Sequence, residues 1–144
     1  MMRALLPVVL LWPALALADH ELDDRDIDNG QILYREHCAS CHGDRLEGQP
    51  NWRQPGEDGL LPAPPHDETG HTWHHDNRLL FDYTKLGGAG LMEARGIAGF
   101  ESGMPGLGDV MSDDEIWDVL AYIRSTWPER IRNIQAKRNP EHGR

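Results

Sequence analysis

The strongest constraint on this chain is the run C-A-S-C-H at residues 38–42. Cys38 and Cys41 are the only cysteines in the sequence, and His42 follows the second one directly. On one helical turn, a spacing of three residues places both sulfurs on the same side of the backbone. C-x-x-C-H is the pattern of covalent c-type haem attachment, in which the histidine ligates the iron. The run therefore predicts one covalent haem, held by both thiols, with His42 as an axial ligand.

Other uses of a cysteine pair fit the sequence less well. A structural zinc site needs four ligands, and the chain has no second cysteine pair. A thiol–disulfide redox motif normally belongs to a βαβ unit, whereas the residues before Cys38 have a helical pattern. A structural disulfide across so short a loop stays open as an alternative, but it would leave His42 unexplained.

The N-terminus has the pattern of a cleaved export signal. Arg3 precedes an uncharged apolar stretch over residues 4–18, which ends in the A-L-A of a cleavage site. The stretch is shorter than the about 20 residues that a transmembrane helix needs. We therefore expect residues 1–18 to be a signal peptide cleaved after Ala18, with a retained anchor as the alternative. The expected location is the periplasm, an oxidising compartment in which haem is attached to thiols.

The charge of the chain narrows the class of partner. The net charge of −10 argues against a nucleic-acid partner and favours a redox partner with a basic face. Residues 19–27 form an acidic N-terminal arm, and residues 128–144 form a basic C-terminal tail. We interpret both as solvated, frayed ends, as chain termini commonly are. The alternative for the basic tail is docking to a membrane or periplasmic oxidoreductase.

The segment 28–127 is expected to form a single all-α domain. A first helix is predicted over about residues 28–41, with Ile32 and Leu33 on its buried side. A second is predicted near residues 77–86, where Gly87 and Gly88 would stop it.

The third predicted helix has the clearest start signal. The run S-D-D-E at residues 112–115 is a capping box, and acidic residues are favoured in a first helical turn. An apolar stripe then continues to Trp127, and Pro128 is predicted to end the helix.

Two long connections, residues 43–76 and 87–111, are rich in glycine and proline. Loops of this length usually serve a site, and a haem would give them a surface to pack against. Met104 in the second loop is the candidate for the other axial ligand, because its thioether is a soft donor and its neighbours hold a tight turn. Met92 and Met111 are the competing methionines.

A histidine-rich segment departs from a minimal haem domain. His66, His71, His74 and His75 stand among carboxylates around Trp73. Such residues suit divalent copper, nickel or zinc, so a second metal is one interpretation. The favoured interpretation is that they are exposed loop residues, which loops tolerate freely.

Taken together, these motifs resemble the class I cytochrome c family. The pattern G-x-x-x-Y-x-x-x-C over residues 30–38 is similar to the family's N-terminal helix, and V-L-A-Y-I at residues 119–123 is similar to its closing helix. The resemblance implies that Gly30 and Tyr34 contact the closing helix. It also implies that the domain holds one haem with a histidine and a methionine as iron ligands. It also implies a proline that supports the proximal histidine, and Pro62 and Pro64 are both candidates.

The function implied by the resemblance is one-electron transfer between redox partner proteins, without catalysis by the chain itself. One alternative is an electron-transfer subunit of a periplasmic dehydrogenase or oxidase. A less favoured alternative is a peroxidase-like haem enzyme, which would need an open coordination position on the iron.

Overall fold

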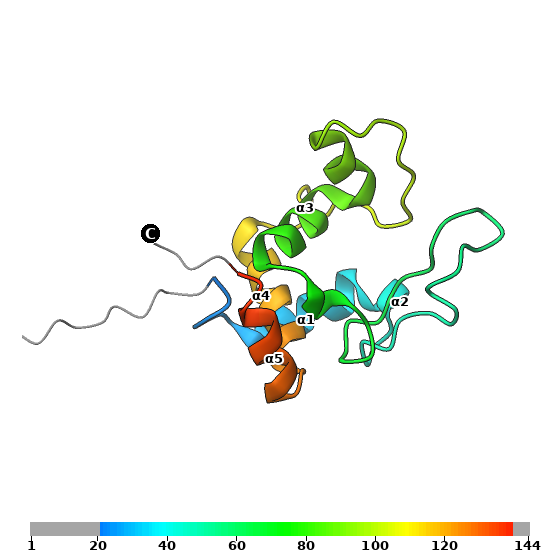
Figure 1. Ribbon diagram of the computed structural model, residues 1–144. Coiled ribbons are helices and arrows are strands. Elements are labelled where there is room, and N and C mark those ends of the chain that lie inside the picture. Colours follow the sequence, from blue (N-terminus) through cyan, green and yellow to red (C-terminus); the bar gives the residue numbers. More distant parts are fainter. Residues whose placement is uncertain (1–20, 140–144) are drawn as a thin grey trace, which may run out of the picture.

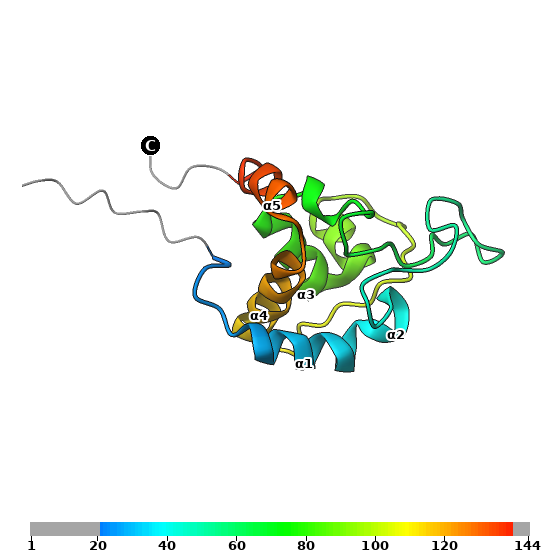
Figure 2. The same cartoon turned by 90° about the horizontal axis from the view of Figure 1, so that it is seen from below.

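The computed structural model describes residues 21–139, and within this range the chain is helical, with no β-strand. Its elements are α1 (Ile27–His37), α2 (Ala39–His42), the 3₁₀ turn η1 (Thr72–His74), α3 (Asn77–Ala94), α4 (Asp113–Ser125) and α5 (Glu129–Ala136). Figures 1 and 2 show α4 against α1, with α2 continuing beyond the end of α1. The predicted all-α class is confirmed.

Helix α1 is capped by Asp26, whose side chain accepts a hydrogen bond from the backbone N–H of Asn29 at 2.9 Å. The single helix expected over residues 28–41 is divided at Cys38, which ends α1 and caps α2. Leu33 is buried as predicted, but Ile32 is 55% exposed, so its predicted burial is wrong. Helix α4 packs on the face of α1 that carries Gly30 and Tyr34, and Ile32 is directed to solvent.

The crossing of α1 and α4 is the centre of the core. The Tyr34 and Tyr122 rings lie 5.6 Å apart, and Tyr34 is fully buried. Asn29 Nδ2 donates to Asp118 Oδ2 at 2.9 Å, which ties the two helices together on a polar side. The predicted meeting of the N-terminal and closing helices is therefore present.

Helix α4 begins at the predicted capping box. The Ser112 side chain accepts from the backbone N–H of Glu115, and the Glu115 carboxylate accepts from the backbone N–H of Ser112 at 2.8 Å. The helix ends at Ser125, earlier than predicted, and the N–H and hydroxyl of Thr126 both donate to the Ile123 carbonyl in its last turn, at 3.2 and 2.7 Å.

Helix α3 is longer than predicted. Gly87 does not stop the helix but kinks it, with φ 72° and ψ 169°, and the second half continues to Ala94. A Cβ atom on Gly87 would overlap the backbone of residues 104–106, and the Gly88 N–H donates to the Met104 carbonyl at 3.2 Å. The glycine pair therefore brings the helix against the loop that carries Met104.

Both ends of the described chain are packed, which corrects the expectation of frayed tails. Leu22 in the acidic arm is 6% exposed and belongs to the core. Within the basic tail, α5 buries Ile131 and Gln135, and Gln135 Nε2 donates to Asn77 Oδ1 at 2.7 Å. An apolar residue on the inner side of each segment outweighs the charges on its outer side. The predicted signal peptide, residues 1–18, lies outside the described residues.

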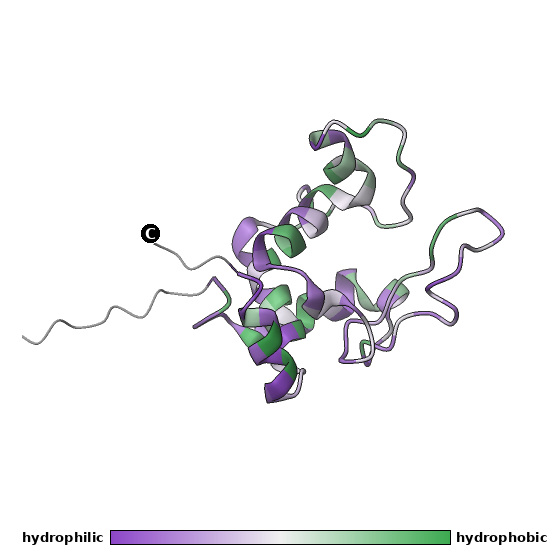
Figure 3. Ribbon diagram, in the orientation of Figure 1, coloured by the Kyte–Doolittle hydropathy of each residue, from purple (hydrophilic) through white to green (hydrophobic). Residues whose placement is uncertain are grey.

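The two long loops extend on the same side of the molecule as α2 (Figure 1). Figure 3 shows hydrophobic stretches on both, and Leu61, Ile97 and Phe100 are each at least 45% exposed. Of the helices within residues 21–139, none is both long and apolar enough to cross a membrane.

Candidate haem site

Both thiols of the C-x-x-C-H run lie on one tight turn. The N–H groups of Cys41 and His42 both donate to the Cys38 carbonyl, at 3.1 and 2.9 Å. Of the two cysteines, Cys38 is buried and Cys41 is exposed. Burial, and then the neighbouring Cys41, raise the pKa of the Cys38 thiol to about 11. The turn presents two cysteine sulfurs and an imidazole within five consecutive residues.

The imidazole of His42 is oriented by a backbone carbonyl. His42 is 7% exposed, and its Nδ1 lies 2.8 Å from the carbonyl oxygen of Pro64. A carbonyl only accepts, so Nδ1 carries the proton and Nε2 keeps its lone pair for a metal. Burial lowers the pKa of His42, which favours the neutral ring; the hydrogen bond to Pro64 acts in the opposite direction and is the smaller effect. Of the two prolines left open by the sequence, Pro64 is the one whose carbonyl meets this ring.

The Pro64 carbonyl is held in place by a close approach of two loop segments. The Gly48 N–H donates to the His42 carbonyl at 2.7 Å, and the Gln49 N–H donates to the Ala63 carbonyl at 2.8 Å. A Cβ atom on Gly48 would overlap the backbone of Pro64 and Pro65, and Gly48 also has a φ of 67°. Glycine is therefore required here for the proline segment to reach His42.

His66 lies inside the site and not in an exposed histidine cluster. Its ring stacks on that of His42, with centroids 4.0 Å apart and planes 26° apart. Its Nδ1 is 2.8 Å from the Thr72 hydroxyl, and Trp127 Nε1 donates to its carbonyl at 2.7 Å. Burial holds the pKa of His66 well below its usual range, and nearby His42 and His71 act in the same direction.

The remaining histidines of that segment are held by aromatic contacts. His71 stacks on Trp52 with centroids 5.2 Å apart, and His74 stacks on Trp73 at 3.7 Å. Within residues 21–139, no group of three or more His, Cys, Asp or Glu side chains is arranged to hold a metal ion. The second-metal interpretation of the segment therefore gains no support.

Met104 is half-buried on the loop that follows α3. Its backbone N–H donates to the Ser102 hydroxyl at 3.2 Å, and its carbonyl accepts from Gly88. Met111, an alternative candidate for the iron ligand, is 3% exposed, and its side chain is packed in the helical core. Met92 lies half-buried in the second half of α3. Assignment of Met104 as an iron ligand stays a prediction.

The donor set and its surroundings fit a haem. Two thiols can form thioethers, a neutral imidazole offers Nε2, and a soft sulfur donor stands on a separate loop. Large apolar side chains such as Leu61, Ile97 and Phe100 are exposed on the two loops, although apolar groups of this size usually gain from burial. An apolar macrocycle between the loops would cover such side chains.

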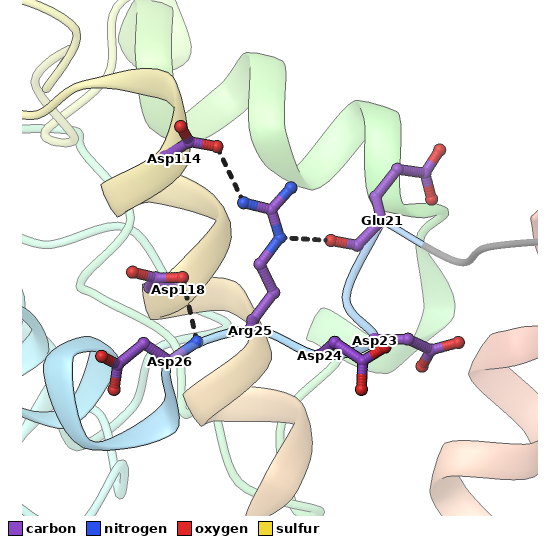
Figure 4. Close-up of a pocket in the computed structure, with 7 residues that line it drawn as sticks. All are labelled: Glu21, Asp23, Asp24, Arg25, Asp26, Asp114 and Asp118. Carbon is purple, nitrogen blue, oxygen red and sulfur yellow. Dashed lines mark hydrogen bonds and ion pairs between the residues drawn. The ribbon is translucent and has the colours of Figure 1, made fainter.

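A hollow elsewhere on the surface is not part of this site. Figure 4 shows it near the start of α1 and along α4, lined by Glu21, Asp23, Asp24, Arg25, Asp26, Asp114 and Asp118. Its lining is charged and contains neither thiols nor imidazoles, which makes it unsuited to a haem.

Comparison with known proteins identifies the family. The family model described as cytochrome c matches residues 27–127. The chain belongs to the cytochrome c family. The chain is also similar to the thiosulfate dehydrogenase of Stutzerimonas stutzeri (strain A1501), with 34% identity over 102 residues. The match covers 69% of this chain and 27% of that protein, so the chain spans about a quarter of the relative's length. No solved structure gives a significant match.

Membership of this family implies a covalently bound haem c and haem-based electron transfer. The sequence predicted both cysteines and His42 on one helical turn, and the structure places them there. The sequence did not predict that His66 lies on His42, although its position directly after the P-P pair at residues 64–65 could have indicated it. A residue two positions from the carbonyl that holds His42 cannot lie far from that ring.

Proposed function

We propose that the protein is a periplasmic c-type cytochrome that carries one electron at a time through a single covalent haem. Cys38 and Cys41 would hold the haem through thioether bonds, and His42 and Met104 would ligate its iron. The observation that carries the proposal is the hydrogen bond between His42 Nδ1 and the Pro64 carbonyl, on the same turn as both thiols. That bond leaves Nε2 as a metal donor on a ring whose orientation is fixed.

When bound, a haem supplies reversible one-electron exchange between ferrous and ferric iron, at a potential that a Met/His ligand pair raises. The chain contributes position and environment. The Pro64 carbonyl makes the His42 imidazole a stronger donor by accepting a hydrogen bond from its Nδ1–H. The Gly87 kink holds the Met104 loop against α3, which keeps the second donor in place. Packed against a haem, the apolar loop residues would exclude water, and a dry environment would disfavour the more highly charged oxidised state.

The proposal includes the domain organisation expected from the sequence. Residues 1–18 are a signal peptide cleaved after Ala18, and residues 28–127 are the cytochrome domain. The match of the family model to residues 27–127 supports the extent of the domain. Export is consistent with a covalent haem, because a cysteine pair left without a ligand in the oxidising periplasm would tend to form a disulfide.

The proposed partner is a redox protein with a basic face. The acidic residues of Figure 4 give one end of the described chain a negative surface, only partly offset by Arg25, which pairs with Asp114 at 2.9 Å. Opposite charges on two proteins speed their encounter and are screened by salt. Electron transfer to the partner should therefore slow as ionic strength rises.

A second candidate is an electron-transfer subunit of a larger oxidoreductase. The relative that shares 34% identity with this chain is a thiosulfate dehydrogenase, and only a quarter of its length is matched. A cytochrome that works beside a separate catalytic chain would be consistent with that partial match. The carrier is preferred because the cytochrome c match over residues 27–127 supports electron transfer directly, whereas the subunit role is supported by one partial match.

The attachment and ligand assignment can be tested together on periplasmic protein. Intact-mass analysis should give the mature chain plus one haem, and acidified organic solvent should extract none. The ferric protein should show the weak near-infrared band of sulfur-to-iron charge transfer. Met104→Ala should abolish that band, whereas Met92→Ala and Met111→Ala should keep it. Retention of the band in Met104→Ala would contradict the ligand assignment.

The carrier and the subunit differ in how they purify. A carrier should elute alone from a mild, low-salt extraction and exchange electrons with several acceptors. A subunit should elute with a larger chain and separate from it only at high salt. Co-elution with one partner in constant proportion would replace the carrier proposal by the subunit proposal.

A further inference from the structure

His42 is held by one hydrogen bond, which does not by itself define the plane of its ring. The Pro64 carbonyl fixes the direction of Nδ1, at 2.8 Å. A carbonyl oxygen accepts over a broad range of angles, so the imidazole can still tilt about that contact. Some other group must set the tilt, and the flat face of the ring is the surface on which it can act.

The group on that face is the imidazole of His66. The two rings are 4.0 Å apart with planes 26° apart, which is a stacked arrangement. Stacked rings resist tilting because any rotation separates one edge and crowds the other. The tilt of His42 is therefore coupled to the orientation of His66.

His66 is fixed from four directions. Its N–H donates to the Leu46 carbonyl at 2.8 Å, and its own carbonyl accepts from Trp127 Nε1 at 2.7 Å. The Tyr34 ring meets it edge-on, with centroids 6.2 Å apart and planes at 75°. These contacts hold the backbone and one edge. The contact that sets rotation of the ring itself is the 2.8 Å bond between Nδ1 and the Thr72 hydroxyl.

We propose that His66 is a positioning residue that sets the plane of the His42 imidazole, and that Thr72 sets the plane of His66. The contacts are consecutive: Thr72 in η1 bonds to His66, the His66 ring stacks on that of His42, and His42 bonds to the Pro64 carbonyl. An aliphatic side chain at position 66 would fill the same space but could not bond to Thr72. The 3₁₀ turn therefore controls the orientation of the proximal ligand. This inference rests on the proposed function insofar as His42 must be the axial ligand.

The test uses the ferric holoprotein and the paramagnetically shifted proton resonances of the haem methyl groups. The spread and order of these shifts report the plane of an axial imidazole, and they do so independently of electron-transfer activity. Thr72→Val removes the hydroxyl while keeping the side-chain shape, so the methyl shifts should change in spread or order. Thr72→Ser restores a hydroxyl and should return the wild-type pattern.

Two further variants separate this role from a general structural one. His66→Phe keeps a flat ring but cannot bond to Thr72, and it leaves the 3.5 Å contact of Thr72 with the Pro65 carbonyl untouched. It should move the methyl shifts in the same sense as Thr72→Val. Thr84→Val removes an equally buried hydroxyl that bonds only within α3, to Leu80, and should leave the pattern unchanged.

The outcomes are distinct for the two proposals. Wild-type methyl shifts in both Thr72→Val and His66→Phe would overturn the positioning role. A change in Thr84→Val as large as that in Thr72→Val would also overturn it. The proposed function would instead fail if the wild-type protein carried no covalent haem or lacked the resonances of a ligated imidazole. If His66→Phe does not fold, the comparison of Thr72→Val with Thr72→Ser decides.

Discussion

The backbone carbonyl of Asp118 in α4 lies directly against Gly30 in α1, at the point where the two helices cross. A Cβ atom on Gly30 would overlap that carbonyl and would crowd the Cβ of Tyr122 at 3.0 Å. The helices can approach this closely only where one of them has no side chain. The approach allows Tyr34 to reach Tyr122 and brings the start of the C-x-x-C-H turn against the core.

The first prediction is that Gly30→Ala destabilises the protein. Alanine normally favours a helix over glycine by about 1 kcal/mol, but here the added methyl group forces the helices apart. Overpacking of this kind costs about 1–3 kcal/mol. Urea unfolding of the holoprotein should show the loss as a lower midpoint.

The matched control for Gly30 is Gly90→Ala in α3. A Cβ atom there meets only the Cβ of Leu86 at 3.5 Å, which is ordinary contact. Gly90→Ala should therefore be neutral or stabilising, opposite in sign to Gly30→Ala. Equal effects of the two changes would mean that the close crossing is absent.

The second prediction concerns the kink in α3. Gly87→Ala places a side chain at φ 72°, which costs about 1–2 kcal/mol, and pushes it into the backbone of residues 104–106. The loop that carries Met104 must then move away from α3. We expect lower stability together with weakening or loss of the near-infrared sulfur-to-iron band.

The control for the kink is Gly99→Ala. Gly99 has a φ of 75°, close to that of Gly87, but no atom lies within 4 Å of an added Cβ. The backbone strain is therefore shared while the clash with the loop is not. If Gly99→Ala weakens the near-infrared band as much as Gly87→Ala, contact with the Met104 loop is not the cause.

The third prediction concerns α5, within the tail that the sequence indicated as frayed. Ile131 is 2% exposed, so Ile131→Ala should cost about 2–5 kcal/mol, as for a core residue. Arg130→Ala, at an exposed position of the same helix, should change stability by no more than about 0.5 kcal/mol. Similar unfolding midpoints for the two variants would restore the frayed-tail interpretation.

Local signals in the sequence were sufficient for the elements whose determinants are local. The capping box at Ser112 and the C-x-x-C-H turn each depend on a few neighbouring residues, and both lie where they were predicted. The apolar spacing of α1 did not separate Ile32 from Leu33, because both are aliphatic and only the position of α4 decides which one is buried.

Features that depend on distant segments could not be read from local pattern. From the local sequence, Gly87 is expected to end a helix. Its close approach to residues 104–106, which the local sequence does not reveal, is where α3 kinks and then continues. His66 stands among other histidines in the sequence, and its neighbours Leu46, Thr72 and Trp127 come from three different segments. The burial of Ile131 depends in the same way on the helix folding back onto η1.

The last prediction is a dependence of stability on pH that includes a contribution from His75. Burial lowers the pKa of His75 below its usual 6.5, the charge of His74 lowers it further, Asp76 raises it, and Arg138 lowers it. His71, the other ring in contact, meets it edge-on at 5.4 Å.

The direction of this dependence follows from proton binding by the two states. The unfolded chain takes up a proton at His75 as the pH falls through 6.5, and the folded chain does so only at lower pH. Stability is therefore full above 6.5 and declines between that value and the lower pKa of the folded state. Urea unfolding of the holoprotein between about pH 5 and pH 8 should show this decline in the wild type. His75→Gln should reduce its slope, whereas His37→Gln, on α1 and apart from these groups, should leave the slope closer to that of the wild type. A slope unchanged in His75→Gln would assign the decline to other histidines.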